Sequence, residues 1–554
     1  MSIEGKIAIV TGGANGIGFC TAKKLLENEA KAVAVLDLAD SGGESAVADL
    51  NNEFGKDRAI FLVCDVSKSE ELKESFKKVI DTYETLDIVI NIAGIMDDAD
   101  WEIMVDVNYK GIVHGTILGL HTMGKYKGGN GGVIVNMSSV AGLEGIPIAP
   151  IYGGTQYAIV GFTQSLKHYF EKTGIRMMTI CPGLTTTAMA TRFMSTKEHA
   201  MDLLDEETAA LAMTTMQKQP PEHVASAIIQ LIDEGKNGTI FVSENNQPPY
   251  AVEIPSYTNL KIPIYQVTTH SLAKNDTIRI VRLETIGKIH QTMDNIKNKT
   301  ALVTGGASGL GLDYATKLLQ NGAKAVALLD LSTSPGQTSA TNLEKEFGKG
   351  KAVFFPCDVT NTKEFSETFK KVWNALNGLD IVINNAGMFD DRQWEKTIRL
   401  NVTGVVQGSL LALELMGKHK GGRGGTIVNI SSIVGLQPYK CCPVYCASKH
   451  NVMAFSHCLQ ESFDITGVRI LVMCPGVTST GLLDSIQEKV LDFIDKEETV
   501  AMLSKLPSQS TDNVAQAMVS LIQKGMNGSV WVSEGGEPPF AVEFPLWKKV
   551  ELNL

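Results

Sequence analysis

The chain repeats itself, and this duplication limits its possible folds more than any other feature of the sequence. Thr11-Gly12-Gly13-Ala14-Asn15-Gly16-Ile17-Gly18 recurs as Thr304-Gly305-Gly306-Ala307-Ser308-Gly309-Leu310-Gly311. The same spacing maps Asp37 to Asp330 and Tyr152 to Tyr445. A repeat unit that extends from Thr11 to the residue before Thr304 is too long for one unit of a solenoid. We therefore expect two complete domains.

The repeat also predicts the domain boundaries. The segment Pro248-Pro249-Tyr250-Ala251-Val252-Glu253-Ile254-Pro255 matches Pro538-Pro539-Phe540-Ala541-Val542-Glu543-Phe544-Pro545, shortly before the chain ends. We therefore expect a first domain over residues 1–260 and a second over 293–554. Residues 261–292 match neither copy and are expected to form a flexible, dispensable linker. Met293 resembles a start, which suggests two neighbouring genes, either truly fused or joined in error.

Short apolar runs alternate with longer amphipathic segments in each copy. In the first copy, alternating strand and helix patterns of this kind predict a parallel sheet with helices on both faces. We therefore expect an α/β fold with two doubly wound (Rossmann) domains in tandem. The expected strands of the first copy cover residues 7–10, 32–36, 59–63, 88–90, 133–135, 177–180 and 239–242.

Charge and cysteine content exclude several classes of protein. The net charge is −11 and the pI is about 5.5, which argues against nucleic-acid or anionic-membrane partners. No uncharged apolar run reaches the roughly 18 residues of a membrane span. The nine cysteines lack the paired spacing of a zinc site, so we expect no metal and free thiols in a reducing cytoplasm. The strand pattern begins at Gly5, so no signal peptide is expected.

A Gly-rich turn after the first strand of each copy predicts a nucleotide site. Such a turn lets backbone N–H groups and a helix N-terminus approach a pyrophosphate that side chains would keep away. Asp37 and Asp330 end the next strand, about 20 residues after the glycines. A carboxylate there accepts hydrogen bonds from ribose hydroxyls and repels the extra phosphate of NADP. We therefore expect NAD as the cofactor.

Several spaced motifs resemble the short-chain dehydrogenase/reductase family. They are Thr-Gly-x-x-x-Gly-x-Gly, an Asn-x-Ala-Gly strand end, and a Ser followed by Tyr-x-x-x-Lys. Both copies match along their full lengths, so the resemblance covers all but the linker. Within the family, Asn429-Ile430-Ser431-Ser432 and residues 445–450 are most similar to the 15-hydroxyprostaglandin dehydrogenases, insect alcohol dehydrogenases and insect fat-body proteins.

The resemblance implies a set of site residues in each copy. In the second copy it implies that Ser432 orients the substrate oxygen, that Lys449 also holds the nicotinamide ribose, and that Asn401 anchors a water in a proton relay. The implied cofactor residues of the second copy are Gly305, Ser308, Gly309, Leu310, Gly311, Asp330, Asp358, Val359, Asn385, Ala386, Gly387, Tyr445, Lys449, Pro475, Gly476 and Thr480. Those of the first copy are Gly12, Asn15, Gly16, Ile17, Gly18, Asp37, Asp65, Val66, Ala93, Gly94, Pro182, Gly183 and Thr187.

The chemistry of the second copy follows from two side chains. Tyr445 and Lys449 are four residues apart and share one face of a helix. A free phenol titrates near pH 10, and a cationic lysine with a positive nicotinamide lowers that pKa. We therefore expect Tyr445 to take the proton of an alcohol while hydride passes to NAD.

The first copy departs from this pattern at one position. Asn108, Ser139 and Tyr152 are present, but Gln156 stands where the second copy has Lys449. A neutral amide cannot stabilise a tyrosinate by charge. We expect the first copy to bind NAD and turn over weakly or not at all.

The substrate is expected to be an apolar or lipid-like secondary alcohol, or the matching ketone. Met388 and Phe389 could line an apolar pocket, and the segment from Thr478 to about Ser508 is expected to cover it. The apolar residues of that segment would equally suit packing on its own domain; they are Leu482, Leu483, Phe493 and Ile494. Family members commonly associate through the helices that carry the catalytic Asn and Tyr, which implies an internal pseudo-dimer or a homo-oligomer. The alternative function is a non-catalytic NAD-binding or storage protein of the fat-body type.

Overall fold

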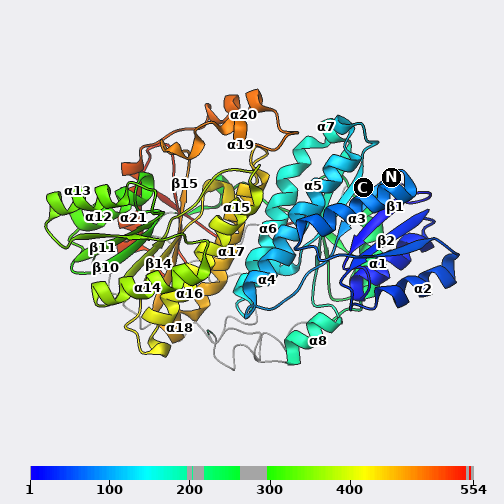
Figure 1. Ribbon diagram of the computed structural model, residues 1–554, viewed down its shortest axis with the longest axis horizontal. Helices are drawn as coiled ribbons and strands as arrows, with labels where there is room; N and C mark the ends of the chain where they lie inside the picture. Colours follow the sequence, from blue (N-terminus) through cyan, green and yellow to red (C-terminus); the bar gives the residue numbers. More distant parts are fainter. Residues whose placement is uncertain (1, 196–202, 204–216, 263–295, 545–547, 551–554) are drawn as a thin grey trace.

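The computed structural model contains two similar α/β halves that lie side by side (Figure 1). It describes residues 2–195, 203, 217–262, 296–544 and 548–550. Each half has a central sheet with helices on both faces, as the alternating pattern predicts. The predicted strands of the first copy all appear within one or two residues of their expected bounds. The expected fold class is therefore confirmed.

Each half is built on one mixed sheet of nine strands, seven of them parallel. In the first half the order is β3 (Ala59–Val63), β2 (Ala32–Asp37), β1 (Ile7–Thr11), β4 (Ile88–Asn91), β5 (Gly132–Met137), β6 (Ile175–Pro182), β7 (Ile240–Ser243), β8 (Tyr250–Glu253) and β18 (Lys548–Val550). In the second half it is β12 (Ala352–Pro356), β11 (Ala325–Asp330), β10 (Thr300–Thr304), β13 (Ile381–Asn384), β14 (Gly425–Ile430), β15 (Val468–Pro475), β16 (Val530–Ser533), β17 (Phe540–Val542) and β9 (Lys261–Ile262).

The strand order reverses beside the first strand of each half, between β1 and β4 and between β10 and β13. Ligands of doubly wound sheets bind outside the carboxyl ends of the strands at this switch point. The helices cover the two faces. In the first half they are α1 (Gly16–Glu27), α2 (Gly43–Phe54), α3 (Ser69–Tyr83), α4 (Trp101–Val105), α5 (Gly111–Met123), α6 (Pro150–Leu166), α7 (Phe170–Thr173), α8 (Ala188–Ser195) and α10 (Pro221–Glu234). In the second they are α12 (Gly309–Gln320), α13 (Gly336–Phe347), α14 (Thr362–Leu376), α15 (Trp394–Ile398), α16 (Gly404–Met416), α17 (Pro443–Leu459), α18 (Phe463–Thr466), α19 (Ile486–Lys489), α20 (Lys496–Leu503) and α21 (Thr511–Lys524).

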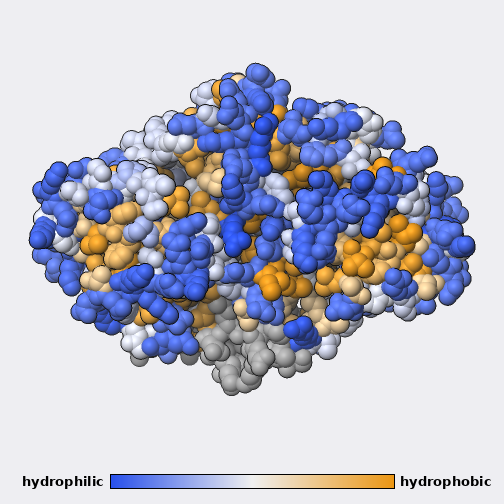
Figure 2. Space-filling model, viewed as in Figure 1, coloured by the Kyte–Doolittle hydropathy of each residue, from blue (hydrophilic) through white to orange (hydrophobic). Residues whose placement is uncertain are grey.

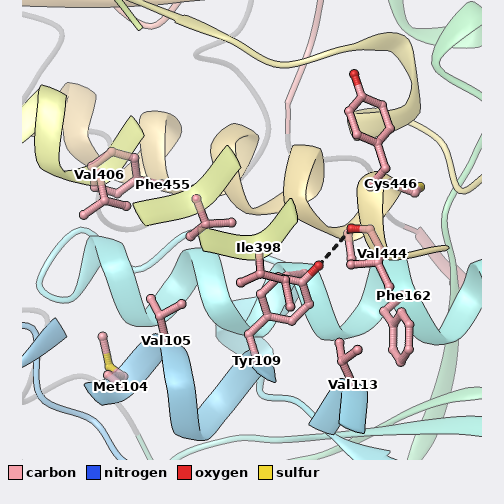
Figure 3. Close-up of a cluster of buried hydrophobic side chains, with 14 of the residues drawn as sticks. Met104, Val105, Tyr109, Val113, Phe162, Ile398, Val406, Val444, Cys446 and Phe455 are labelled. Carbon is pink, nitrogen blue, oxygen red and sulfur yellow. Dashed lines mark hydrogen bonds between the residues drawn. The ribbon is translucent and has the colours of Figure 1, made fainter. Parts of the chain in front are cut away.

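The two halves meet through α6 and α17, which run side by side in the middle of the molecule (Figure 1). One hydrophobic cluster continues across this boundary. Figure 3 shows part of it, in which Val105 and Phe162 come from the first half and Ile398 and Phe455 from the second. In its centre the hydroxyl of Tyr109 donates a hydrogen bond of 2.9 Å to the carbonyl oxygen of Val444. The two halves thus pack through the helices that carry Tyr152 and Tyr445, and the expected internal pseudo-dimer or homo-oligomer stays a prediction.

The halves also exchange their last strands. β9 belongs to the first copy in sequence but pairs antiparallel with β17 of the second half. Reciprocally, β18 from the end of the chain pairs antiparallel with β8 of the first half. Lys261 and Ile262, the first two residues of the predicted linker, thus form an edge strand of the second sheet. Residues 263–292 lie outside the described part of the chain, so the flexibility of the linker stays a prediction.

The surface agrees with the moderate mean hydropathy of the sequence. Figure 2 shows a face covered mostly by hydrophilic residues, with smaller hydrophobic areas on the sides of both halves. Within the described residues, no helix combines the length and the apolar character that crossing a membrane requires.

Cutting the chain between residues 263 and 292 should not separate the halves. The α6–α17 contact and the exchanged strands β9 and β18 hold them together without the covalent connection. We expect a protein cleaved at an engineered protease site there to elute as one particle near the intact mass of 59.8 kDa. Light scattering after size exclusion measures this. Two species of about half that mass would contradict the interface.

Candidate active site

The Gly-rich turns of both halves form cradles in which side chains do not fit. Gly305 has a φ of +64°, and a Cβ on it would lie 3.0 Å from the Cα of Ala386. A Cβ on Gly311, in the first turn of α12, would lie 2.0 Å from the carbonyl oxygen of Gly305. Gly12 and Gly18 make the equivalent approaches in the first half. The N-terminus of a twelve-residue helix thus opens onto a side-chain-free turn, which suits a pyrophosphate.

The carboxylate of Asp330 stands at the end of β11, beside this turn. Its two oxygens accept backbone hydrogen bonds from Ala307 (3.0 Å) and Leu331 (2.8 Å). Asp37 accepts the equivalent bonds from Ala14 and Leu38. The carboxylate therefore fixes the Gly-rich turn as well as facing the cavity, a structural role that sequence reasoning does not reveal. Each oxygen keeps a second lone pair for a ribose hydroxyl.

A side-chain amide ties the end of β13 to the Gly-rich turn in the second half, in addition to the backbone bonds to the first threonine of the turn that both halves make. The Asn385 amide donates hydrogen bonds to the carbonyl oxygens of Thr304 (2.9 Å) and Gly305 (3.3 Å). Ile92 occupies the equivalent place in the first half and has no side-chain hydrogen-bond donor. The two halves therefore differ in their cofactor cradles as well as at Gln156.

A single cavity of about 840 Å³ brings together the predicted site of the second half. Ser432, Tyr445 and Lys449 all line it. So does every residue of the predicted cofactor set of that half: Gly305, Ser308, Gly309, Leu310, Gly311, Asp330, Asp358, Val359, Asn385, Ala386, Gly387, Pro475, Gly476 and Thr480. The volume lies within the range of ligand and cofactor pockets.

Burial dominates the electrostatics of the catalytic pair. It raises the pKa of Tyr445 well above the usual value of a phenol, and the hydrogen bond with Ser432 acts in the opposite direction. Burial also lowers the pKa of Lys449 to about 8. The Lys449 Nζ lies 5.7 Å from the centre of the Tyr445 ring and donates a hydrogen bond of 2.9 Å to the carbonyl oxygen of Ile430. An ammonium at that distance favours the tyrosinate form.

Asn401 lies on a wide π-helical turn, Arg399–Thr403, between α15 and α16. Its side chain accepts a hydrogen bond from the Met388 N–H (2.9 Å) and donates to the Met388 carbonyl oxygen (2.9 Å) and to the Ser448 hydroxyl (3.0 Å). Single π-turns inside helices often mark functional sites. Asn401 thereby fixes the strand-end loop beside the cavity, although it does not itself line the cavity.

A buried carboxylate that the sequence analysis missed holds the start of α17. Asp391 accepts hydrogen bonds from the backbone N–H groups of Val444 (2.8 Å) and Tyr445 (2.9 Å). Burial raises its pKa to about 7 against the opposing effect of these two bonds. Asp98 holds α6 in the same way. The only signal for this role in the sequence is that the repeat maps one aspartate onto the other.

The first half keeps the frame of this site without its cation. Ser139 bonds to Tyr152 and lowers its pKa, but burial is the larger effect and raises that pKa to about 12. Gln156 is buried, and its amide donates to the Thr155 hydroxyl at 3.3 Å. Asn108 contacts the backbone of Ile95 as Asn401 contacts Met388. Two of the predicted cofactor residues also approach glycines closely: a Cβ on Gly16 would lie 3.2 Å from Thr187, and a Cβ on Gly111 would lie 2.9 Å from Val66.

One part of the cavity wall is mostly apolar and carries two thiols. Met388, Phe389, Leu482 and Leu483 line it, together with Cys441 and Cys442. The Phe389 ring packs edge-on against that of Tyr445, with centroids 5.0 Å apart.

The segment from Thr478 to about Ser508, which was expected to cover the pocket, partly lines the cavity and partly packs against the first half. Phe493 and Ile494 are buried and do not line the cavity. Phe493 instead stacks edge-on with Tyr126 and Tyr169 of the first half. The sequence left pocket lining and packing open for this segment. The structure assigns Leu482 and Leu483 to the cavity, and Phe493 to the contact between halves.

Comparison with known proteins agrees with this arrangement. The model of the short chain dehydrogenase family matches residues 6–198 and residues 299–491. The chain belongs to the short-chain dehydrogenase family, in two copies. Similar curated proteins are the NAD⁺-named 15-hydroxyprostaglandin dehydrogenases of Mus musculus and Homo sapiens, each 37% identical over 242 residues. The match covers 43% of this chain and 90% or 91% of those enzymes, which is the length of one copy.

Proposed function

We propose that this protein is an NAD-dependent alcohol dehydrogenase whose working site lies in the second half. The proposed substrate is a small secondary alcohol of apolar or lipid-like character, or the matching ketone in the reverse direction. One observation carries the proposal. Ser432, Tyr445 and Lys449 face the same cavity as the Gly-rich cradle, Asp330 and Asn385.

The cavity residues fit a nicotinamide dinucleotide. The cradle of Gly305 and Gly311 accepts a pyrophosphate, and the remaining lone pairs of Asp330 accept ribose hydroxyls. When bound, the cofactor supplies the nicotinamide carbon that takes up hydride. The similar 15-hydroxyprostaglandin dehydrogenases are named as NAD⁺-dependent enzymes. A carboxylate at position 330 favours that choice because it repels the extra phosphate of NADP.

The protein's own groups handle the proton. The Ser432 hydroxyl orients the alcohol oxygen, and the Tyr445 phenolate takes its proton. The Lys449 ammonium stabilises that phenolate, and Asp391 fixes the position of Tyr445 by holding its backbone N–H. Phe389, Leu482 and Leu483 exclude water from the apolar part of the substrate. The similar enzymes are named for 15-hydroxyprostaglandin, and the apolar wall supports an apolar substrate here.

We propose a different role for the first half, namely binding of NAD with little or no turnover. Gln156 and Ile92 favour this reading, since the site lacks both the cation beside Tyr152 and the amide that ties the strand end to the Gly-rich turn. An NADH absorbance assay of the full chain with a panel of secondary alcohols tests the proposed activity. Cofactor binding without NADH formation for any alcohol would support the storage-protein alternative instead.

The cofactor preference should depend on Asp330. Asp330→Asn keeps the shape of the side chain but removes its charge. We expect it to weaken NAD binding and to reduce the preference for NAD over NADP by roughly 1.5 to 3 kcal/mol. Fluorescence titration with NADH and NADPH measures both affinities. Asp37→Asn is the matched control and should leave the turnover of the second half unchanged. A wild-type protein that binds NADPH more tightly than NADH would refute the role of Asp330.

The charge four residues after the tyrosine should account for the difference in activity between the two halves. We expect Lys449→Gln to lower alcohol oxidation at pH 7 by about 10² to 10⁴-fold, the usual worth of a positioned base. Gln156→Lys in that background should restore a smaller part of the activity, because Ala149 stands in the first half where Cys442 lines the cavity of the second.

The loss of alcohol oxidation rate in Lys449→Gln, relative to the wild-type protein, should be smaller at pH 9 than at pH 7. A phenol with a raised pKa gains its reactive form as the pH rises, and the wild-type Lys449, with a pKa of about 8, loses its charge over the same interval. Initial rates at both pH values measure the deficit. Wild-type-like rates for Lys449→Gln at pH 7 would contradict the assignment.

A further inference from the structure

The end of the first copy lies on the second half, close to the proposed active site. We call residues 254–262 the first-half tail. Its strand β9 pairs with β17, with Ile262 opposite Ala541 and Lys261 opposite Val542. The Glu543 N–H also donates to the carbonyl oxygen of Leu260 at 3.2 Å. The tail is thus held by the backbone of the other half over several residues.

The tail contacts a carboxylate next to the cofactor cradle. The Tyr257 hydroxyl donates a hydrogen bond of 2.8 Å to Glu534 Oε2, and the Lys261 Nζ lies 3.9 Å from Glu534 Oε1. A Cβ on Gly476 would lie only 2.7 Å from the Cβ of Glu534. Gly476 lines the cavity. Glu534 therefore connects the first-half tail directly with a wall of the cofactor site.

The tail also supports the loop that carries the catalytic serine. The Ser256 hydroxyl donates a hydrogen bond of 3.0 Å to Gln437 Oε1. Tyr257 is 5% exposed and packs in one hydrophobic cluster with Ile433 and Leu436. The segment from Ser432 to Tyr439, which we call the serine loop, lines the cavity at both of its ends. The tail thus packs behind the wall on which Ser432 stands.

We propose that the first half serves to position the active site of the second half. Its tail holds the serine loop and the Gly476 wall in place through Ser256, Tyr257 and Lys261. This inference rests on the proposed dehydrogenase activity of the second half. The inference gives the first half a function that does not require a lysine at position 156. A half without turnover would still supply the contacts of the tail.

The first half offers a matched control for the central contact. Tyr250 donates a hydrogen bond of 2.7 Å to Glu244, the counterpart of Glu534, but it does so within its own half. Tyr257→Phe and Tyr250→Phe therefore remove the same chemical group from a tyrosine–glutamate pair, once across the halves and once inside the first half. The Tyr257 bond joins the two halves, whereas the Tyr250 bond joins two residues of the first half.

The experiment measures two properties of each full-length variant. The first is kcat/KM for the best alcohol found in the panel, with NADH affinity determined separately. The second is hydrogen exchange of the backbone amides of residues 433–439, followed by mass spectrometry, which does not depend on activity. The variants are Tyr257→Phe, Ser256→Ala combined with Tyr257→Phe, and Tyr250→Phe.

We expect Tyr257→Phe to lower kcat/KM by about tenfold, the equivalent of about 1.4 kcal/mol, and the double variant to lower it further. Exchange in the serine loop should become faster in both, while Tyr250→Phe changes neither property. Unchanged kcat/KM or unchanged exchange in the double variant would overturn the inference. Absence of NADH formation by the wild-type protein would instead refute the proposed function, and the exchange result would still report on the tail.

Discussion

The contact between α6 and α17 is the constraint on which the rest of the structure depends. Two glycines of α6 allow it: a Cβ on Gly161 would lie 2.6 Å from the His450 ring, and one on Gly154 would lie 3.2 Å from the Asn451 amide. The same two helices carry Tyr152 and Tyr445. In each half, the surface that joins the halves and the tyrosine of the candidate site therefore lie on the same helix. A change at the helix contact is transmitted to both sites.

The two halves have diverged in chemistry within a common frame. The Gly-rich cradle, the helix-holding aspartates and the π-turn with its asparagine occur in both. The differences lie at Gln156 and Lys449, and at Ile92 and Asn385. These substitutions change charge and hydrogen bonding but not the fold. A copy that loses its catalytic cation can consequently keep its packing contacts and its exchanged strand.

Much of this arrangement is predictable from the sequence, because it depends on local patterns. The alternating apolar runs predict the sheets. The residue that ends β11 predicts that Asp330 lies at the cavity, and the spaced Ser and Tyr-x-x-x-Lys motif predicts the same of Tyr445. Contacts between distant segments are not predictable in the same way. Strand β9 is only two residues long, and its partner β17 lies far along the chain. The role of Asp391 is likewise hard to predict, since it lies more than 50 residues before the N–H groups of Val444 and Tyr445 that it holds, and only the repeat singles it out.

The central claim is that turnover occurs at Tyr445 and not at Tyr152. The most direct measurement is the rate of NADH formation by the full chain carrying Tyr445→Phe, compared with the chain carrying Tyr152→Phe. Both variants lose one phenolic hydroxyl and keep the aromatic ring. The account predicts that Tyr445→Phe abolishes alcohol oxidation while Tyr152→Phe retains most of it. Loss of activity in Tyr152→Phe, with Tyr445→Phe still active, would contradict it.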